Sequence, residues 1–266
     1  MKESKTQKEI IPPVERELIE DELNGDRFIQ NTNKGNNQIY IVNHHNSPHT
    51  MREIGRLREV SFRTAGGGTG HEIDMDTYDT TDRCYEQLIV YSREDQEIIG
   101  GYRFITGQRA RNPKTGAYEL STAHYFHFSE EMMQEYLPCS IELGRSWVQP
   151  NYQPSVNPRK GLFALANIWD GLGALITHYP EMKYFFGKVT MYKNYNSEAR
   201  DILLSFMAHY FPDSQKLCYP KEELFAGFEE DVFNEYFSHN PPFSDGFKIL
   251  HKLLKDRGEW IPPLIN

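Results

Sequence analysis

Two hydrophobic periods alternate along the chain and predict its helices and strands. Apolar residues recur at helical spacing over residues 50–63, where Thr50 followed by Glu53 is typical of a helix N-terminus. Short apolar runs over residues 87–91 and 97–106 are joined by a polar turn. These two runs predict a β-hairpin.

The second half of the chain alternates strands with helices. Residues 140–150 and 184–191 predict strands, and residues 159–178 and 197–210 predict amphipathic helices. The first of these helices is expected to bury one apolar face, formed by Leu162, Leu165, Trp169, Leu172 and Ile176. With a further strand over residues 38–43, this order predicts an α/β (α+β) fold, a mixed sheet with helices on its faces.

The two ends of the chain differ from its middle. Residues 1–37 are polar and rich in asparagine, which predicts a loose N-terminal arm with at most one short helix over residues 14–23. Residues 38–266 predict a single domain, whose last part is a series of helical pieces broken by prolines.

One predicted strand carries two charges among bulky apolar residues. Glu142 and Arg145 lie three residues apart beside Trp147, and charged residues are rarely buried unless they are paired or functional. In a regular strand the two side chains point to opposite faces. A bulge at Gly144 turns both toward one cleft, and we expect such an irregularity there. The alternative is a buried structural ion pair.

An acidic cluster over residues 71–79 follows a glycine-rich run over residues 65–70. Its spacing matches neither a calcium-binding EF-hand loop nor a zinc-binding helix motif. Its carboxylates suit a cationic amine, although a solvated loop has similar support. The glycine run follows a predicted helix, so a mobile loop is favoured over a phosphate cradle.

Charge and cysteine content narrow the function further. A net charge of −9 argues against nucleic acid as the main partner. Three cysteines without metal-ligand spacing fit a reducing cytoplasm, and no metal site is predicted.

The apolar stretch over residues 161–179 is too short and too polar at its centre to span a membrane, which leaves peripheral membrane contact open. Residues 159–161 open a predicted helix with two cations and form a weak anion-site pattern.

These motifs, in this order, resemble the GNAT acyltransferase superfamily. They are most similar to the bacterial N-acyltransferases that make ornithine-lipid and glycine-lipid precursors, to which acyl-homoserine-lactone synthases are related. The resemblance is carried by Asp76-Thr-Tyr-Asp79, Gly100-Gly-Tyr-Arg103, Glu142-Leu-Gly-Arg145-Ser-Trp-Val-Gln-Pro150, Tyr184-Phe-Phe-Gly187 and Asn196-Ser-Glu-Ala199. It implies a mainly antiparallel sheet, splayed at its centre, with helices on both faces. Family members usually continue beyond residue 266, so we expect a truncated chain.

The resemblance also implies a reaction and a set of residue roles. A (3-hydroxy)fatty acyl group moves from an acyl-carrier-protein thioester to the α-amino group of glycine or ornithine, and no tightly bound cofactor is needed. Glu142 is the general base, with Arg145 and Arg103 as further catalytic residues. The implied substrate-binding residues are Glu72, Asp76, Asp79, Trp147 and Val148. The implied residues for the phosphopantetheine phosphate are Arg159, Lys160 and Gly161.

Three alternatives remain open at this stage. The first is a coenzyme-A-dependent GNAT acetyltransferase of a small amine or protein, and the second is an acyl-binding module without turnover. The third is homoserine-lactone synthesis.

An acyl carrier protein is acidic, so a chain with a net charge of −9 needs a local basic face to dock it. The candidates for that face are Arg109, Arg111, Lys114, Arg159 and Lys160.

Overall fold

The computed structural model describes residues 7–222, 230–237, 240–262 and 265. Residue contacts divide the chain into two compact units. Unit 1 comprises residues 1–121 and 135–187, and unit 2 comprises residues 122–134 and 188–266. That residues 38–266 act as a single domain stays a prediction.

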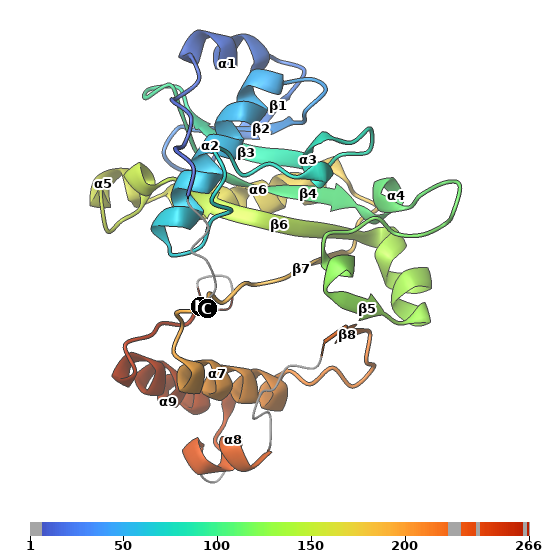
Figure 1. The fold of residues 1–266 in the computed structure, drawn as a ribbon, viewed down its shortest axis with the longest axis vertical. Coiled ribbons are helices and arrows are strands. Elements are labelled where there is room, and N and C mark those ends of the chain that lie inside the picture. Colours follow the sequence, from blue (N-terminus) through green and yellow to red (C-terminus); the bar gives the residue numbers. More distant parts are fainter. Residues whose placement is uncertain (1–6, 223–229, 238–239, 263–264, 266) are drawn as a thin grey trace. The chain divides into compact units, whose positions relative to one another are not determined.

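Unit 1 is built on a six-stranded sheet, shown in Figure 1. Its strand order is β1-β2-β3-β4-β6-β7. The strands are β1 (Phe28–Asn31), β2 (Gln38–Val42), β3 (Glu86–Ser92), β4 (Glu97–Thr106), β6 (Ser140–Val148) and β7 (Tyr184–Gly187). Every neighbouring pair is antiparallel except β6 and β7, which run parallel. The β6–β7 pairing includes all four residues of β7 and ends at Leu143, about halfway along β6. The expected splay at the centre of the sheet stays a prediction.

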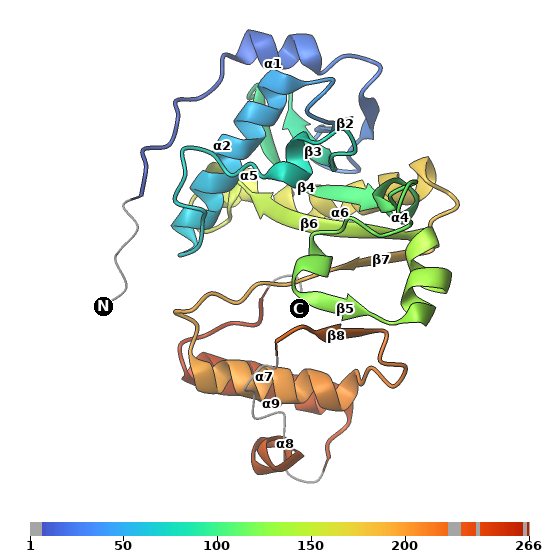
Figure 2. The same cartoon turned by 45° about the vertical axis from the view of Figure 1, so that its right-hand side comes forward.

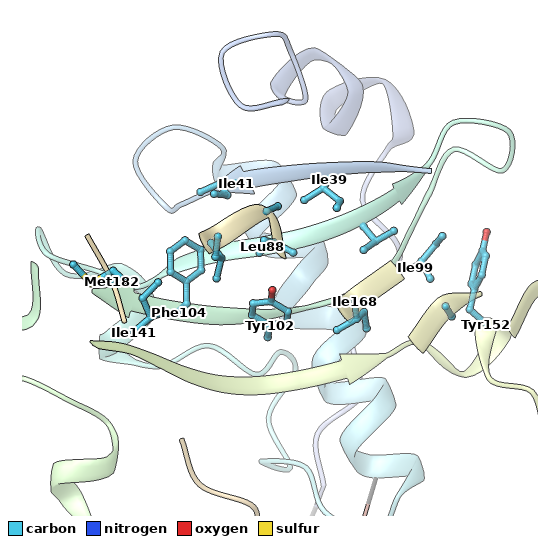
Figure 3. Packing of buried hydrophobic residues seen from close by; sticks show 14 residues of the cluster. Ile39, Ile41, Leu88, Ile99, Tyr102, Phe104, Ile141, Tyr152, Ile168 and Met182 are labelled. Carbon is cyan, nitrogen blue, oxygen red and sulfur yellow. The ribbon is translucent and has the colours of Figure 1, made fainter. Parts of the chain in front are cut away.

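Helices cover both faces of this sheet, which confirms the predicted fold class. In Figure 1, α2 (Pro48–Thr64) and α3 (Thr77–Thr80) lie in front of the sheet and α6 (Ala164–His178) lies behind it. The α6-side core joins Leu88, Tyr102 and Phe104 of the sheet to α6, and Figure 3 shows part of this packing. The α2-side core joins Met51, Ile54 and Leu57 to the opposite face of the sheet; its sheet members include Tyr40, Val42, Ile89, Tyr91 and Trp147.

The N-terminal residues are more ordered than their composition predicts. Residues 1–6 lie outside the described part, but α1 (Arg16–Glu22) confirms the expected short helix. Ile19 of α1 is buried in the α2-side core, and β1 is the edge strand of the sheet. The Glu22 carboxylate accepts hydrogen bonds from the backbone N–H groups of His49 (2.9 Å) and Thr50 (2.7 Å) in the first turn of α2. The expectation of a loose arm is therefore wrong for residues 7–37.

Two helix predictions need correction. Helix α2 begins at Pro48, two residues before the predicted N-cap Thr50. The helix predicted over residues 159–178 is divided into α5 (Pro158–Gly161) and α6. The apolar face expected to be buried is mostly exposed, and α6 buries a different set of residues, several of them small. These are Ala164, Asn167, Ile168, Gly171, Ala174 and Leu175.

Unit 2 has a helical core of its own. In Figure 2, α7 (Ser197–Tyr210), α8 (Glu230–Tyr236) and α9 (Phe243–Asp256) lie together, and Phe206, Phe237 and Leu250 are buried among them. The predicted bounds of α7 are confirmed, and its N-cap Asn196 accepts a hydrogen bond from Ala199 N–H at 3.0 Å. A two-stranded sheet pairs β5 (Phe126–Phe128) with β8 (Cys218–Pro220).

The other short elements connect these parts. They are α4 (Gly107–Ala110), η1 (Thr122–His124), η2 (Met132–Tyr136), η3 (Leu137–Cys139) and η4 (Pro150–Tyr152). Within the described residues, no helix is long and apolar enough to cross a membrane.

Candidate active site

Strand β6 is irregular where its charged residues lie. Its pairing with β4 aligns Gly144 with Arg103 and Trp147 with Gly101, so two residues of β6 face one residue of β4. Arg145, the first of the two, has a φ of 50°, in the left-handed region that side chains rarely adopt. The strand therefore carries a β-bulge. The predicted irregularity is present, but it lies at Arg145 and not at Gly144.

The bulge decides which face of the sheet each later residue occupies. Side chains alternate along a strand, so one extra residue reverses the alternation beyond it. Leu143 before the bulge and Val148 after it both pack against the α6-side core, whereas Trp147 packs in the α2-side core. The α2 side therefore gathers Glu142, Arg145 and Trp147, which a regular strand would divide between two faces.

A buried ion network lies on this same side of the sheet. Arg58 of α2 is fully buried and donates two hydrogen bonds to Asp79, at 3.1 and 3.2 Å, and one to Asp74 at 3.2 Å. Gln87 of β3 donates a further hydrogen bond to Asp79 at 3.1 Å. Burial raises the pKa of Asp79, but the charges of Arg58 and Arg103 outweigh burial and lower it to about 2. Asp79 is therefore ionised at neutral pH.

The network continues through Arg103 and ends at an exposed edge. Nη1 of Arg103 donates to both carboxylate oxygens of Asp76, at 2.8 and 2.9 Å, and to Asp79 at 3.3 Å. Nε of Arg145 lies 2.9 Å from Asp74, and its Nη2 lies 3.6 Å from Asp76. The side chains of Arg145 and Asp76 are each 31% exposed, against 3% for Arg103. A solute thus meets the network at Arg145 and Asp76.

The acidic cluster is folded into a capped turn. The Asp76 carboxylate accepts a hydrogen bond from Tyr78 N–H at 2.9 Å, and Asp79 accepts one from Asp76 N–H at 3.1 Å. This reciprocal capping box starts the single turn α3 and holds both carboxylates toward the arginines. The solvated-loop alternative therefore does not describe Asp76 and Asp79. Glu72, in contrast, is exposed, and its substrate-binding role stays a prediction.

Glu142 is buried and held by two hydroxyl groups. The hydroxyl of Tyr85 donates to Oε2, and the hydroxyl of Ser121 donates to Oε1 at 2.8 Å. The Tyr85 oxygen also accepts a hydrogen bond from Ser121 N–H at 2.8 Å, so the three residues fix one another. Burial and the neighbouring Glu142 charge raise the pKa of Tyr85, which keeps its phenol protonated as a donor. The Arg103 guanidinium lies 5.0 Å from the centre of the Tyr85 ring and connects Glu142 to the ion network.

Sequence reasoning missed Arg58, Asp74, Tyr85 and Ser121 as members of this site. Only Arg58 left a clear signal, because it follows Ile54 and Leu57 at a position of the helical pattern that faces the core. A charged residue at such a position needs a buried partner. The partner lies on a separate loop, so the sequence did not identify it.

The predicted phosphate site offers fewer free donors than expected. The turn α5 is capped by Asn157, whose side chain accepts Lys160 N–H at 3.1 Å, and Lys160 Nζ lies 2.5 Å from Asp95. A Cβ on Gly161 would lie 2.5 Å from Pro154 N, so this glycine permits close packing of the loop before α5. A phosphate site on residues 159–161 stays a prediction, and it now depends mainly on Arg159, which is exposed.

The glycine-rich loop is held by a buried carboxylate. Glu59 of α2 accepts hydrogen bonds from Thr69 N–H (2.8 Å), the Thr69 hydroxyl (2.7 Å) and Gly70 N–H (2.9 Å). Burial raises the pKa of Glu59, but these donors and Arg63 lower it overall. The expected mobile loop is thus fastened to α2. Within the described residues, no three His, Cys, Asp or Glu side chains are grouped to bind a metal ion.

The chain is similar in sequence to known acyltransferases. Residues 57–159 match the acetyltransferase (GNAT) domain family. Over 258 residues, the chain is 50% identical to a protein of Bacteroides thetaiotaomicron and 45% identical to one of Phocaeicola vulgatus, both named glycine N(alpha)-acyltransferase. Each alignment spans 97% of this chain, with 76% and 79% of the respective relatives. No solved structure matches the chain significantly.

Proposed function

The chain belongs to the GNAT-type N-acyltransferase family of these two relatives, and we propose that it transfers a fatty acyl group from a thioester to the α-amino group of glycine. The names of the relatives supply the acceptor. The observation that carries the proposal is the buried Glu142 carboxylate, fixed by Tyr85 and Ser121 on the sheet face that also holds the ion network.

Amide formation from an amine requires a proton acceptor, and we assign that role to Glu142. The amine nitrogen attacks the thioester carbonyl carbon, a C–N bond forms and the C–S bond breaks. Glu142 accepts the proton that the amine loses, directly or through a water, and the departing thiolate takes up that proton at the end. Backbone N–H groups beside the bulge, near Trp147 and Val148, are proposed to stabilise the oxyanion that develops on the carbonyl.

The two arginines, implied by the family resemblance to be catalytic, take different parts in the proposed binding of the amino acid. Arg103 is almost fully buried and donates to Asp76 and Asp79, so we assign it to bracing the acidic residues. Arg145 is partly exposed, and its guanidinium suits the carboxylate of the amino acid. Asp76, exposed to the same extent, attracts the acceptor's ammonium group before it is deprotonated. Asp79 is fully buried and positions the arginines.

The thioester donor is proposed to be an acyl carrier protein loaded with a 3-hydroxyacyl chain, and the product an N-acyl amino acid of lipid biosynthesis in the cytoplasm. Arg111, Lys114, Arg159 and Lys160 are exposed in unit 1, but the first two follow the Thr106 end of the β4–β6 pair and the last two follow its Val148 end (Figure 1). The expected single basic face is therefore divided into two separate patches, and we propose that one of them docks the carrier. Carrier binding should weaken as salt increases, because opposite charges on the two surfaces are screened. Binding that is independent of salt contradicts this docking surface.

One assay tests the function. The purified chain is given one of three donors, a 3-hydroxyacyl-carrier protein, the matching acyl-coenzyme A or acetyl-coenzyme A. Glycine, ornithine, serine or no acceptor is added, and products are identified by mass spectrometry. We expect N-acylglycine with the carrier-protein donor. Glu142→Gln should lower turnover by at least about 100-fold, while Glu119→Gln, which alters an exposed residue paired with Arg83, should not. Transfer of acetyl groups alone, acyl binding without thiol release, or full turnover by Glu142→Gln contradicts the proposal.

A further inference from the structure

Helix α6 presents an apolar stripe away from the sheet. Leu165 (50%), Trp169 (61%) and Ile176 (55%) are exposed, and Leu162 (65%), just before the helix, continues the stripe. At 100° per residue, the three helical members lie within about 40° of one another on the helix surface. We call Leu162, Leu165, Trp169 and Ile176 the α6 outer face.

This stripe is not left over from the core, because α6 already buries a different face. Ile168 and Leu175 pack in the α6-side core, and Gly171 lets the helix approach the sheet closely. A Cβ on Gly171 would lie 2.5 Å from Leu88 and 2.9 Å from the Tyr102 hydroxyl. The helix therefore buries Ile168 and Leu175 among small residues toward the sheet and presents a second set of large apolar residues to solvent. Contiguous exposed apolar residues of this kind mark an interaction surface.

Exposed cations lie at both ends of the α6 outer face, although Lys160 is also paired with Asp95 at 2.5 Å. Exposed Arg159 and Lys160 precede the helix, and exposed Lys183 follows it. The carboxylate within α6, Asp170, accepts hydrogen bonds from Asn33 N–H at 3.0 Å and from the Asn33 side chain at 2.6 Å. Glu181 is the exposed carboxylate beside Lys183. Cations thus flank an apolar stripe on a chain whose net charge is −9.

We propose that the α6 outer face docks on the surface of a lipid bilayer that contains anionic headgroups. An apolar helix face with a tryptophan, flanked by cations, lies in the plane of such an interface. The tryptophan ring suits the boundary between acyl chains and headgroups, and the flanking cations are attracted to anionic lipids. At 15 residues, α6 is too short to span the bilayer and lies along it. The inference goes beyond the proposed function and does not depend on it.

The chain offers a matched pair of tryptophans for the test. Trp169 lies in the α6 outer face and is 61% exposed, whereas Trp260 is 63% exposed and belongs to unit 2. The full chain is sedimented with vesicles of phosphatidylcholine, with or without about a third phosphatidylglycerol. Trp169→Ser should lower the partition coefficient on anionic vesicles about tenfold, and Leu165→Ser should lower it similarly. Trp260→Ser should change it less than twofold, and neutral vesicles should bind the unchanged chain more weakly.

A spectroscopic measurement locates the contact independently of variant stability. In a Trp260→Phe background, the remaining tryptophans are exposed Trp169 and buried Trp147. Vesicles made with brominated acyl chains should quench Trp169 fluorescence and shift its emission to shorter wavelength.

No binding to anionic vesicles, equal losses for Trp169→Ser and Trp260→Ser, or no quenching overturns the proposal. Self-association abolished by Trp169→Ser, without vesicle binding, would instead assign this face to a second copy of the chain. Acyl transfer in solution is measured separately, so failure of the two proposals is distinguishable.

Discussion

Asp79→Asn is the substitution that tests the ion network most directly. Asp79 is fully buried and carries the charge opposite both Arg58 and Arg103. Asparagine has nearly the same shape but leaves the fully buried Arg58 with Asp74 as its remaining ionic partner among these contacts. Removing one partner of a buried ion pair costs about 3–5 kcal/mol, because the other charge stays buried without compensation. We expect a loss of that size in the free energy of unfolding at pH 7.

The pH dependence of stability gives a second, independent value for the contribution of the Asp79 charge. The pKa of Asp79 is lowered from its ordinary value of 3.8 to about 2, which corresponds to about 2 kcal/mol of stability. A lowered pKa means that this stability is fully present above pH 4 and is lost as the pH falls toward 2. Asp79→Asn has no such titration. The difference in unfolding free energy between the unchanged chain and the variant should therefore shrink between pH 4 and pH 2.

Urea denaturation followed by circular dichroism measures the unfolding free energy of the unchanged chain and of Asp79→Asn. The measurement is made at pH 7 and at steps from pH 4 downward. The control is Glu119→Gln, which removes one member of the partly exposed Arg83–Glu119 pair in the same unit. An exposed ion pair contributes about 0–1 kcal/mol, so the control should unfold near the midpoint of the unchanged chain. A loss below about 1 kcal/mol for Asp79→Asn, or equal losses for the two variants, would refute the reasoning.

Three further predictions follow from individual contacts. Tyr85→Phe removes a hydroxyl that donates a hydrogen bond to Glu142 and accepts one from Ser121 N–H. We therefore expect kcat to fall at least about tenfold, with little change in KM for glycine. An unchanged kcat would contradict a positioning role for Tyr85. Arg145→Ala should raise KM for glycine about tenfold or more and leave KM for the thioester unchanged, and the reverse pattern would remove Arg145 from the acceptor site. Gly101→Ala places a Cβ 2.2 Å from the Leu88 carbonyl oxygen and should cost about 1–3 kcal/mol in thermal unfolding. Gly173→Ala, with open space around it, should be neutral or slightly stabilising.

Local patterns predicted the parts of the fold that depend on near neighbours in sequence. The hairpin of β3 and β4 was expected because its two apolar runs are joined by a short polar turn. The helix α7 was expected because its apolar residues recur at helical spacing, and its N-cap Asn196 is also adjacent in the chain. The bulge was foreseen from a conflict, since Glu142 and Arg145 in a regular strand cannot serve one face. Its position at Arg145 depends on the register with β4, which the sequence of β6 does not contain.

Two predictions were wrong, one about the buried face of α6 and one about the order of the N-terminal residues. The helical pattern predicts the apolar stripe of α6 as its core face, yet the sheet packs against the side with Gly171 and Ala174, because small residues allow closer approach. The composition of the N-terminal residues predicts a loose arm. Ile19 and the edge strand β1 are ordered by contacts with residues distant in sequence, which composition does not register.

Patterns in the sequence predicted the type and order of most elements and selected Glu142, Arg145 and the acidic cluster with Asp76 and Asp79 as functional candidates. The family resemblance added Arg103. The contacts between distant segments then decide which of these residues are buried and which reach solvent. Asp79 and Arg103 are buried in a network around Arg58, whereas Arg145 and Asp76 reach solvent. Glu142 acquires its partners Tyr85 and Ser121 from residues 57 and 21 positions away. Local periodicity fixes which residues form a strand or a helix, but burial and charge pairing depend on contacts between distant segments.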